Sequence, residues 1–173
     1  MPLRTGTKED LETMLSLERE FFGVERAELR EAYELILELG GKVLIEYKDG
    51  EPTGMLATVP VDELLQNRGR VLSLPQQSPF RERVKRSYWD GYSGYTLITT
   101  FVSRTASRNL LREFLGIGRS VGFVYDDEQT ILNYERLGCR RNGTVPNIHS
   151  PEKMDCILVY EGRAKSRHLR TFS

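Results

Sequence analysis

The chain has 173 residues, of which 39% are hydrophobic and 29% charged, a composition typical of one globular domain with a sizeable core. Its 25 basic residues balance 25 acidic residues, so no overall positive charge favours a nucleic-acid partner. No apolar run is long enough to cross a membrane, and residues 1–6 lack the apolar centre of a signal peptide. We therefore expect a cytoplasmic protein without a membrane partner.

The N-terminal quarter predicts a short strand followed by two helices. Thr7 and Asp10 form a capping-box pattern, and apolar residues then recur at helical spacing as far as Gly23. A second helical pattern covers residues 26–39 and ends at two glycines.

Residues 42–61 predict a β-hairpin. Two apolar runs flank Asp49 and Gly50, a dipeptide that favours a two-residue turn between antiparallel strands. The sheet therefore begins in the N-terminal half of the chain.

Residues 62–94 end in a basic segment that is rich in aromatic residues. Its charged side chains are Arg81, Arg83, Lys85 and Arg86, and its aromatic side chains are Tyr88, Trp89 and Tyr92. Such a segment could bind an acidic group or stack on a base, which makes the three aromatic residues candidates for substrate binding. The alternative is a solvated basic loop whose aromatic side chains pack down as an anchor.

Residues 95–125 predict a strand, a polar turn, a helix and a second strand. β-branched and aromatic residues fill 95–102, apolar residues recur at helical spacing from Leu110, and 120–125 is again strand-like. The turn at 103–109 is rich in Ser, Thr and Arg, so its free N–H groups at the helix start could hold a phosphate. Ordinary helix capping by the same residues is the alternative.

The C-terminal part predicts a helix from Asp126 to Gly138 and two strands, at 139–145 and 154–160. Residues 163–173 form a polar, basic tail. Cys139 and Cys156 are expected to be reduced core thiols, and no cluster of ligands predicts a metal site.

Residues 130–139 read Thr-Ile-Leu-Asn-Tyr-Glu-Arg-Leu-Gly-Cys, directly after the strand, turn, helix and strand. This order resembles the Gcn5-related N-acetyltransferases, which commonly end the same helix in a Tyr-Glu-Lys-Leu-Gly-Phe-like string. The resemblance implies one α/β (α+β) domain over residues 1–162, with a probable insertion at 62–94 near the acceptor site. It also implies a mixed, mostly antiparallel sheet of about six or seven strands, split near Val102, with helices on both faces.

By this resemblance the chain is an N-acyltransferase that uses acetyl-CoA or another acyl-CoA and no metal. The resemblance implies donor contacts from Phe101, Val102, Arg104, Ser107, Arg108 and Asn109. Tyr134 falls on the family tyrosine that protonates the departing thiolate, a role that suits a phenol. Asp90 and Glu46 are the candidate bases. The acceptor would be a small-molecule or peptide amine, and a homodimer stays open.

The phosphate turn departs from the family pattern. The family places glycine, then glycine or alanine, where this chain has Ser107 and Asn109, and side chains there narrow the approach of a phosphate. Either a variant turn still binds CoA, or the fold has lost its donor. The rival function is a non-catalytic binding module that holds nucleic acid or an acidic partner through residues 81–92.

Overall fold

The computed structural model describes residues 2–22, 29–75, 81, 84, 87–147 and 152–162. For residues 87 and 88 it describes only the backbone. The predicted tail at 163–173 and three of the basic residues, Arg83, Lys85 and Arg86, lie outside the described residues.

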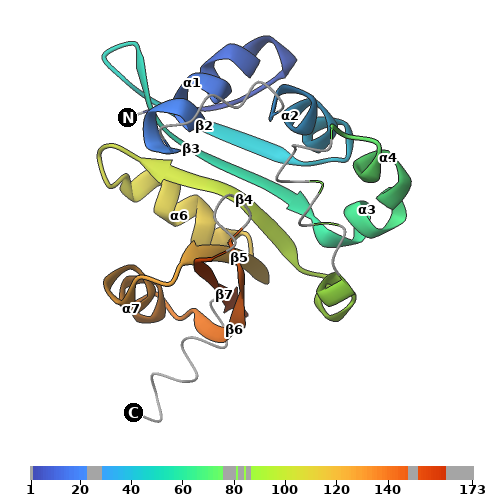
Figure 1. The fold of residues 1–173 in the computed structure, drawn as a ribbon. Coiled ribbons are helices and arrows are strands. Elements are labelled where there is room, and N and C mark those ends of the chain that lie inside the picture. Colours follow the sequence, from blue (N-terminus) through green and yellow to red (C-terminus); the bar gives the residue numbers. More distant parts are fainter. Residues whose placement is uncertain are drawn as a thin grey trace.

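One sheet of seven strands runs through the molecule in the order β1-β2-β3-β4-β5-β7-β6 (Figure 1). The strands are β1 (Leu3–Thr5), β2 (Lys42–Lys48), β3 (Glu51–Pro60), β4 (Thr96–Ser103), β5 (Ser120–Tyr125), β6 (Arg140–Pro146) and β7 (Met154–Tyr160). All neighbours are antiparallel except β4 and β5, which are parallel. The predicted sheet, mostly antiparallel and with six or seven strands, is thereby confirmed.

The hairpin between β2 and β3 turns at the predicted dipeptide. Asp49 and Gly50 both have positive φ, at 52° and 81°. Two successive residues of this kind make a turn whose twist matches that of the flanking strands, and glycine adopts such a φ without strain.

Helices cover both faces of the sheet (Figure 1). On one face lie η1 (Lys8–Asp10), α1 (Leu11–Phe22), α2 (Leu29–Glu38), α3 (Val61–Gln66), α4 (Arg68–Leu72) and η2 (Ser87–Tyr92), and on the other lie α6 (Arg108–Gly116) and α7 (Glu128–Arg136). Thr7 and Asp10 form the predicted capping box at the start of η1. None of the described helices is both long and apolar enough to cross a bilayer.

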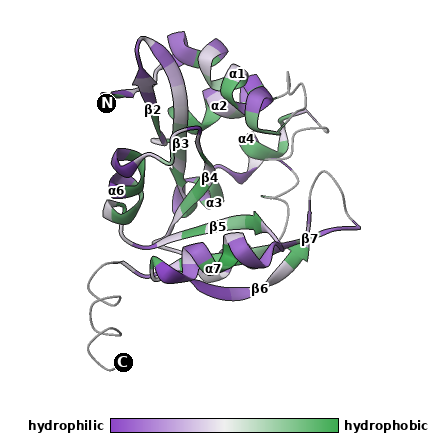
Figure 2. Ribbon diagram, turned by 90° about the vertical axis from the view of Figure 1, so that its left-hand side faces the viewer, coloured by the Kyte–Doolittle hydropathy of each residue, from purple (hydrophilic) through white to green (hydrophobic). Residues whose placement is uncertain are grey.

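Each face has its own hydrophobic core, because successive side chains of a strand point to opposite faces. On β2, for example, Val43 and Ile45 join the core under α1 and α2, while Leu44 joins the core under α6 and α7. The edge strand β6 is hydrophilic along most of its length (Figure 2) and mostly exposed, which discourages pairing with another sheet.

The described residues of 62–94 pack into the larger core. Leu64, Val71 and Val84 are at most 1% exposed and belong to the cluster under α1 and α2. These described residues therefore complete that face of the domain.

Candidate active site

Strands β4 and β5 separate after two residue pairs. Thr96 pairs with Ser120 and Leu97 with Val121, and no further pair joins the two strands. The separation thus starts at Ile98, four residues before Val102, near which the resemblance implied it. Strand β4 also carries a bulge, since Ala57 of β3 pairs with Thr100 and its neighbour Thr58 pairs with Ile98. The extra residue, Thr99, bends β4 and redirects its side chains.

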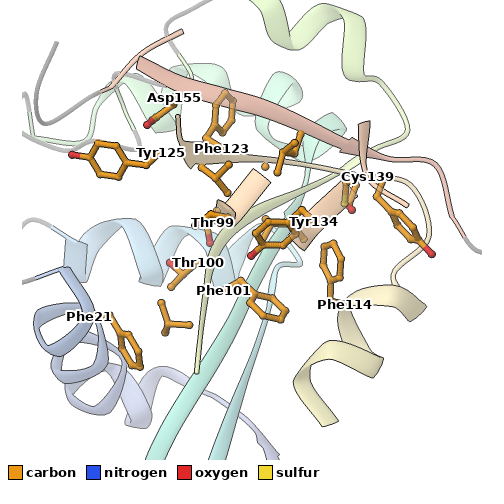
Figure 3. A pocket seen from close by; sticks show the side chains of 18 of the residues that line it. Phe21, Thr99, Thr100, Phe101, Phe114, Phe123, Tyr125, Tyr134, Cys139 and Asp155 are labelled. Atoms are coloured by element: carbon orange, nitrogen blue, oxygen red, sulfur yellow. The ribbon is translucent and has the colours of Figure 1, made fainter. Parts of the chain in front are cut away.

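A pocket of about 590 Å³ lies where the two strands diverge (Figure 3). Its aromatic lining comes from α1, β4, α6, β5, α7 and β7 and consists of Phe21, Phe22, Phe101, Phe114, Phe123, Tyr125, Tyr134 and Tyr160. Val102 also lines it, so the structure brings together Phe101, Val102 and Tyr134, three of the residues that the resemblance singled out. A pocket of this volume and apolar character suits a small organic ligand.

Tyr134 reaches the pocket from α7, and its ring meets Phe114 edge-on at 6.2 Å between centroids. Burial raises the pKa of the phenol above its ordinary value, and the neighbouring Cys139 adds to the rise. The hydroxyl of Tyr134 has no hydrogen-bond partner among the residues that the structure describes. Tyr134 therefore keeps its proton at neutral pH and presents a hydroxyl that is able to donate it.

Cys139 also lines the pocket, beside Tyr134 (Figure 3). Burial raises the pKa of its thiol to about 12, so the thiolate is scarce at neutral pH. Both Cys139 and Cys156 are free and buried, as the sequence indicated. No group of three or more His, Cys, Asp and Glu side chains in the described ranges has the arrangement of a metal site.

The turn between β4 and α6 is held by its own side chains. Ser103 Oγ accepts from the backbone N–H groups of Thr105 (3.3 Å) and Ser107 (3.0 Å). Ser107 is the N-cap of α6 and accepts from Leu110 N–H at 3.1 Å. Ala106, between them, has a φ of 50°, in the left-handed region that favours glycine. Several N–H groups that a phosphate would need are thus already bonded within the turn.

A buried carboxylate lies beneath this turn. Glu46 of β2 is fully buried and accepts from Thr53 Oγ1 (3.1 Å), Thr105 Oγ1 (2.9 Å) and, in a short contact, Ser107 Oγ. It does not line the pocket. This position does not support the predicted role of Glu46 as a base, because its carboxylate fixes the turn and has no contact with the space a substrate would occupy.

The predicted cationic residues of the turn stay outside the pocket. Arg104 donates through two nitrogens to Glu20 of α1, at 2.8 and 2.7 Å, and this bond lowers the pKa of Glu20. Arg108 is exposed at the first position of α6, and Asn109 follows it half-buried. Of the two arginines predicted to contact the acyl donor, Arg108 is therefore exposed at the start of the helix, while Arg104 is paired with the Glu20 carboxylate.

The predicted substrate residues of 81–92 fall into the core. Trp89 is 1% exposed, Tyr92 is buried beside it, and their rings meet at 6.4 Å. Neither lines the pocket, and Asp90 is exposed away from its lining. These positions correct the prediction of direct contact and favour the alternative that the aromatic residues are an anchor. Tyr88 has no described side chain.

The anchor nevertheless supports the pocket. Trp89 packs edge-on against Phe123 at 5.5 Å, and Phe123 lines the pocket from β5. Trp89 thus supports one wall of the pocket, and Arg81 of the same segment donates to the Leu72 carbonyl at 2.7 Å.

Sequence reasoning missed Glu18, which lines the pocket from α1 and is 4% exposed. Its carboxylate accepts from Tyr33 Oη at 2.5 Å and from Thr100 Oγ1 at 2.7 Å. A signal was present, since Glu18 follows Met14 by four residues and precedes Phe21 by three. A charged residue on the apolar stripe of a helix indicates a buried, partnered group.

Comparisons with models of protein families and with curated protein sequences find no match. Solved structures do match. A ribosomal-protein-alanine N-acetyltransferase from Brucella melitensis matches with a TM-score of 0.61 and 14% identity over 93% of this chain and 99% of that one. A putative acetyltransferase from Salmonella typhimurium, solved with acetyl-CoA, matches with a TM-score of 0.58 and 14% identity over 92% of each chain.

An aminoglycoside acetyltransferase solved with coenzyme A and kanamycin gives a TM-score of 0.58 and 18% identity, over 99% of this chain and 98% of that one. Identities this low carry information about the fold and leave the activity to be argued from the site. The predicted resemblance is confirmed at this level: the chain has the fold of the Gcn5-related N-acetyltransferases.

Proposed function

We propose that the chain is an N-acyltransferase that moves an acyl group from an acyl-CoA to an amine bound in the pocket between β4 and β5. The separation of these strands after Leu97 and the pocket that it opens carry this proposal. Beyond Leu97 the backbone of β4 has no pairing with β5, so its polar groups on that side can bond an extended ligand with amide groups. The pantetheine arm of CoA is such a ligand.

The apolar part of the pocket suits the acyl end of the donor. Phe101 and Phe114 meet edge-on at 5.5 Å, and Tyr134 stands next to Phe114. A thioester placed against these rings would be shielded from water, which favours transfer to an amine over hydrolysis.

The reaction removes two protons from the ammonium form of the acceptor and supplies one to the leaving thiolate. The ammonium first loses one proton, and the neutral amine attacks the thioester carbonyl; a C–N bond forms, the C–S bond breaks, the thiolate leaves with the electron pair of that bond, and the nitrogen loses its second proton. Tyr134 is the proton donor for the thiolate, because its phenol lines the pocket and burial raises its pKa. Of the two protons that the nitrogen releases, one restores the phenol through solvent and the other remains in solvent.

The start of α6 is the proposed place for the pyrophosphate. The N-terminus of a helix attracts anions, and Arg108 is exposed there. The fit is partial, because Ser103 and Ser107 already bond three N–H groups of the turn and Glu46 lies below it. A weak donor affinity follows from this arrangement.

Calorimetric titration of acetyl-CoA into the protein, with desulfo-CoA as a comparison, tests whether the chain binds the proposed acyl donor. Saturable binding of both, weakened at least tenfold by Arg108→Glu, is the expected result. The exposed Arg112 of the same helix gives the matched control, Arg112→Glu. Absence of binding at millimolar concentration would refute the donor proposal and leave a fold that has lost its donor.

Tyr134→Phe tests the proton donor. The variant removes one oxygen atom and keeps the ring against Phe114, so donor binding should stay within about twofold of wild type. The acyl-transfer rate should fall by about 10²-fold, within the usual range for loss of a general acid. Unchanged transfer would remove Tyr134 from the mechanism and leave the enzyme class standing.

A further inference from the structure

Glu18 is held in a fixed position at the pocket wall. Two hydroxyls, from Tyr33 on α2 and Thr100 on β4, donate to its Oε1 atom, and the two hydroxyl oxygens are themselves 3.0 Å apart. All three side chains are at most 6% exposed. A buried carboxylate with hydrogen-bond donors from two separate elements has little freedom to turn away from the pocket.

The pocket lining carries acidic groups and no basic ones. Among the described residues that form the lining, Glu18 and Asp155 are carboxylates, and none is Lys, Arg or His. Asp155 of β7 is 3% exposed and accepts from Asn147 Nδ2 at 2.9 Å. Two carboxylates in the lining favour a cation over a neutral or anionic ligand of the same shape.

Aromatic side chains gather on the side of the pocket where Asp155 lies. Figure 3 shows Phe21 and Tyr125 on the opposite side of the view from Phe114 and Cys139, with Asp155 close to Tyr125. Phe22 and Tyr125, 46% and 50% exposed, form the outer part of this region, while Phe123 lies deeper. Aromatic rings next to carboxylates bind the apolar body and the charged end of an organic cation together.

We propose that the acceptor is a small primary amine with an aromatic or bulky apolar body, and that Glu18 binds its ammonium group. The body would lie against Phe21 and Phe123, with Phe22 and Tyr125 at the mouth. Glu18 is then the residue that makes the acceptor site specific for a cation. The identity of this acceptor class rests on the proposed acyl transfer, but the cation preference of the pocket does not.

Three ligands with the same ring and similar reach test the preference: phenethylamine, 2-phenylethanol and 3-phenylpropanoate. They are titrated calorimetrically into the wild-type protein, both alone and with desulfo-CoA present. Phenethylamine should bind at least tenfold more tightly than the alcohol and the carboxylate. Equal affinity for the amine and the alcohol would overturn the inference without any variant.

The variant Glu18→Gln should lose at least tenfold in phenethylamine affinity and keep its affinity for 2-phenylethanol. Glu12→Gln is the matched control, since Glu12 lies on the same helix with its side chain 78% exposed. Circular dichroism and the alcohol titration check that Glu18→Gln is folded with its pocket intact. An unchanged amine affinity in that variant would refute the role of Glu18.

The two proposals fail in different ways. If no CoA compound binds, the acyl transfer is wrong, and the amine titrations of donor-free protein still decide the cation preference. If acetyl-CoA binds and the amine shows no preference over the alcohol, the acceptor inference is wrong and the acyl transfer stands.

Discussion

The substitution Glu46→Gln is expected to tighten the binding of CoA. The carboxylate of Glu46 is fully buried and contacts the hydroxyls of Thr105 and Ser107, on the turn that precedes α6. A negative charge in this position opposes the pyrophosphate that we place at the helix start. Glutamine has the same shape: its oxygen can still accept from Thr105 Oγ1, and its amide NH2 can donate to Ser107 Oγ in place of the bond that the carboxylate accepted, so the turn should keep its conformation.

The size of the effect follows from the chain of contacts. Ser107 Oγ touches Glu46 on one side and lies 3.1 Å from Leu110 N on the other. A phosphate on the first turn of α6 would therefore be about 7 Å from the carboxylate, given hydrogen bonds of about 3 Å. With an effective dielectric constant of about 20–40, one unit of phosphate charge is repelled by about 1–2 kcal/mol. Removing the charge should lower Kd by about 5- to 30-fold.

Calorimetric titration of CoA into the wild-type protein and Glu46→Gln measures the change. Glu31→Gln is the control for a simple change in net charge, because Glu31 is exposed on α2. The predicted gain should shrink as salt is added, although less than for a pair of exposed charges. A Kd that stays equal to that of Glu31→Gln, or rises, would refute either the pyrophosphate position or the opposing effect of Glu46.

Three further outcomes follow from the same site. Ala106→Gly removes the strain of a φ of 50° and should raise stability by about 1 kcal/mol, measured as the urea midpoint; an unchanged midpoint would contradict strain at this residue. Because burial raises the pKa of Cys139 to about 12, its native thiol should react with a disulfide reagent at pH 8 about 10³-fold more slowly than a free thiol, and a fast native reaction would contradict its burial. Since burial also raises the pKa of Tyr134, acyl transfer should decline only as pH rises above about 10, where an unperturbed phenol would already lose its proton; a decline centred below pH 9 would point to a different acid.

Local patterns were enough to predict most of the fold. The strands at 120–125 and 154–160 agree with the observed β5 and β7, because β-branched and aromatic runs bounded by turn residues depend on neighbours in the chain. The Asp49–Gly50 turn is equally local, since its positive φ values are a property of two adjacent residues. Tyr134, on the most specific motif of the resemblance, lines the pocket, and its role as proton donor stays a prediction.

The roles of the acidic residues could not be predicted in this way. Glu18 meets Thr100 across 82 positions of sequence, and Glu46 meets Ser107 across 61. Each carboxylate is also close to a β-bulge. Glu18 bonds to Thr100, which follows the bulge residue Thr99 on β4, and Glu46 lies opposite the bulge at Thr53 on β3. A bulge changes which face the following side chains occupy, so alternation along the strand does not give their direction.

Their positions relative to the pocket give the two carboxylates different expected functions. Glu46 and Glu18 are both buried and both bonded by hydroxyl groups, and so resemble each other in their local chemistry. Glu46 lies beneath the turn, where a negative charge can only oppose an anionic donor, whereas Glu18 faces the pocket, where the same charge attracts a cationic acceptor. Loss of charge at the two positions should therefore have opposite effects. Glu46→Gln should raise the affinity for CoA and leave the affinity for the amine unchanged. Glu18→Gln should lower the affinity for the amine and leave the affinity for CoA unchanged. Since the two residues are on different elements and share no partner among the described contacts, the effects of the two substitutions should add in the double variant.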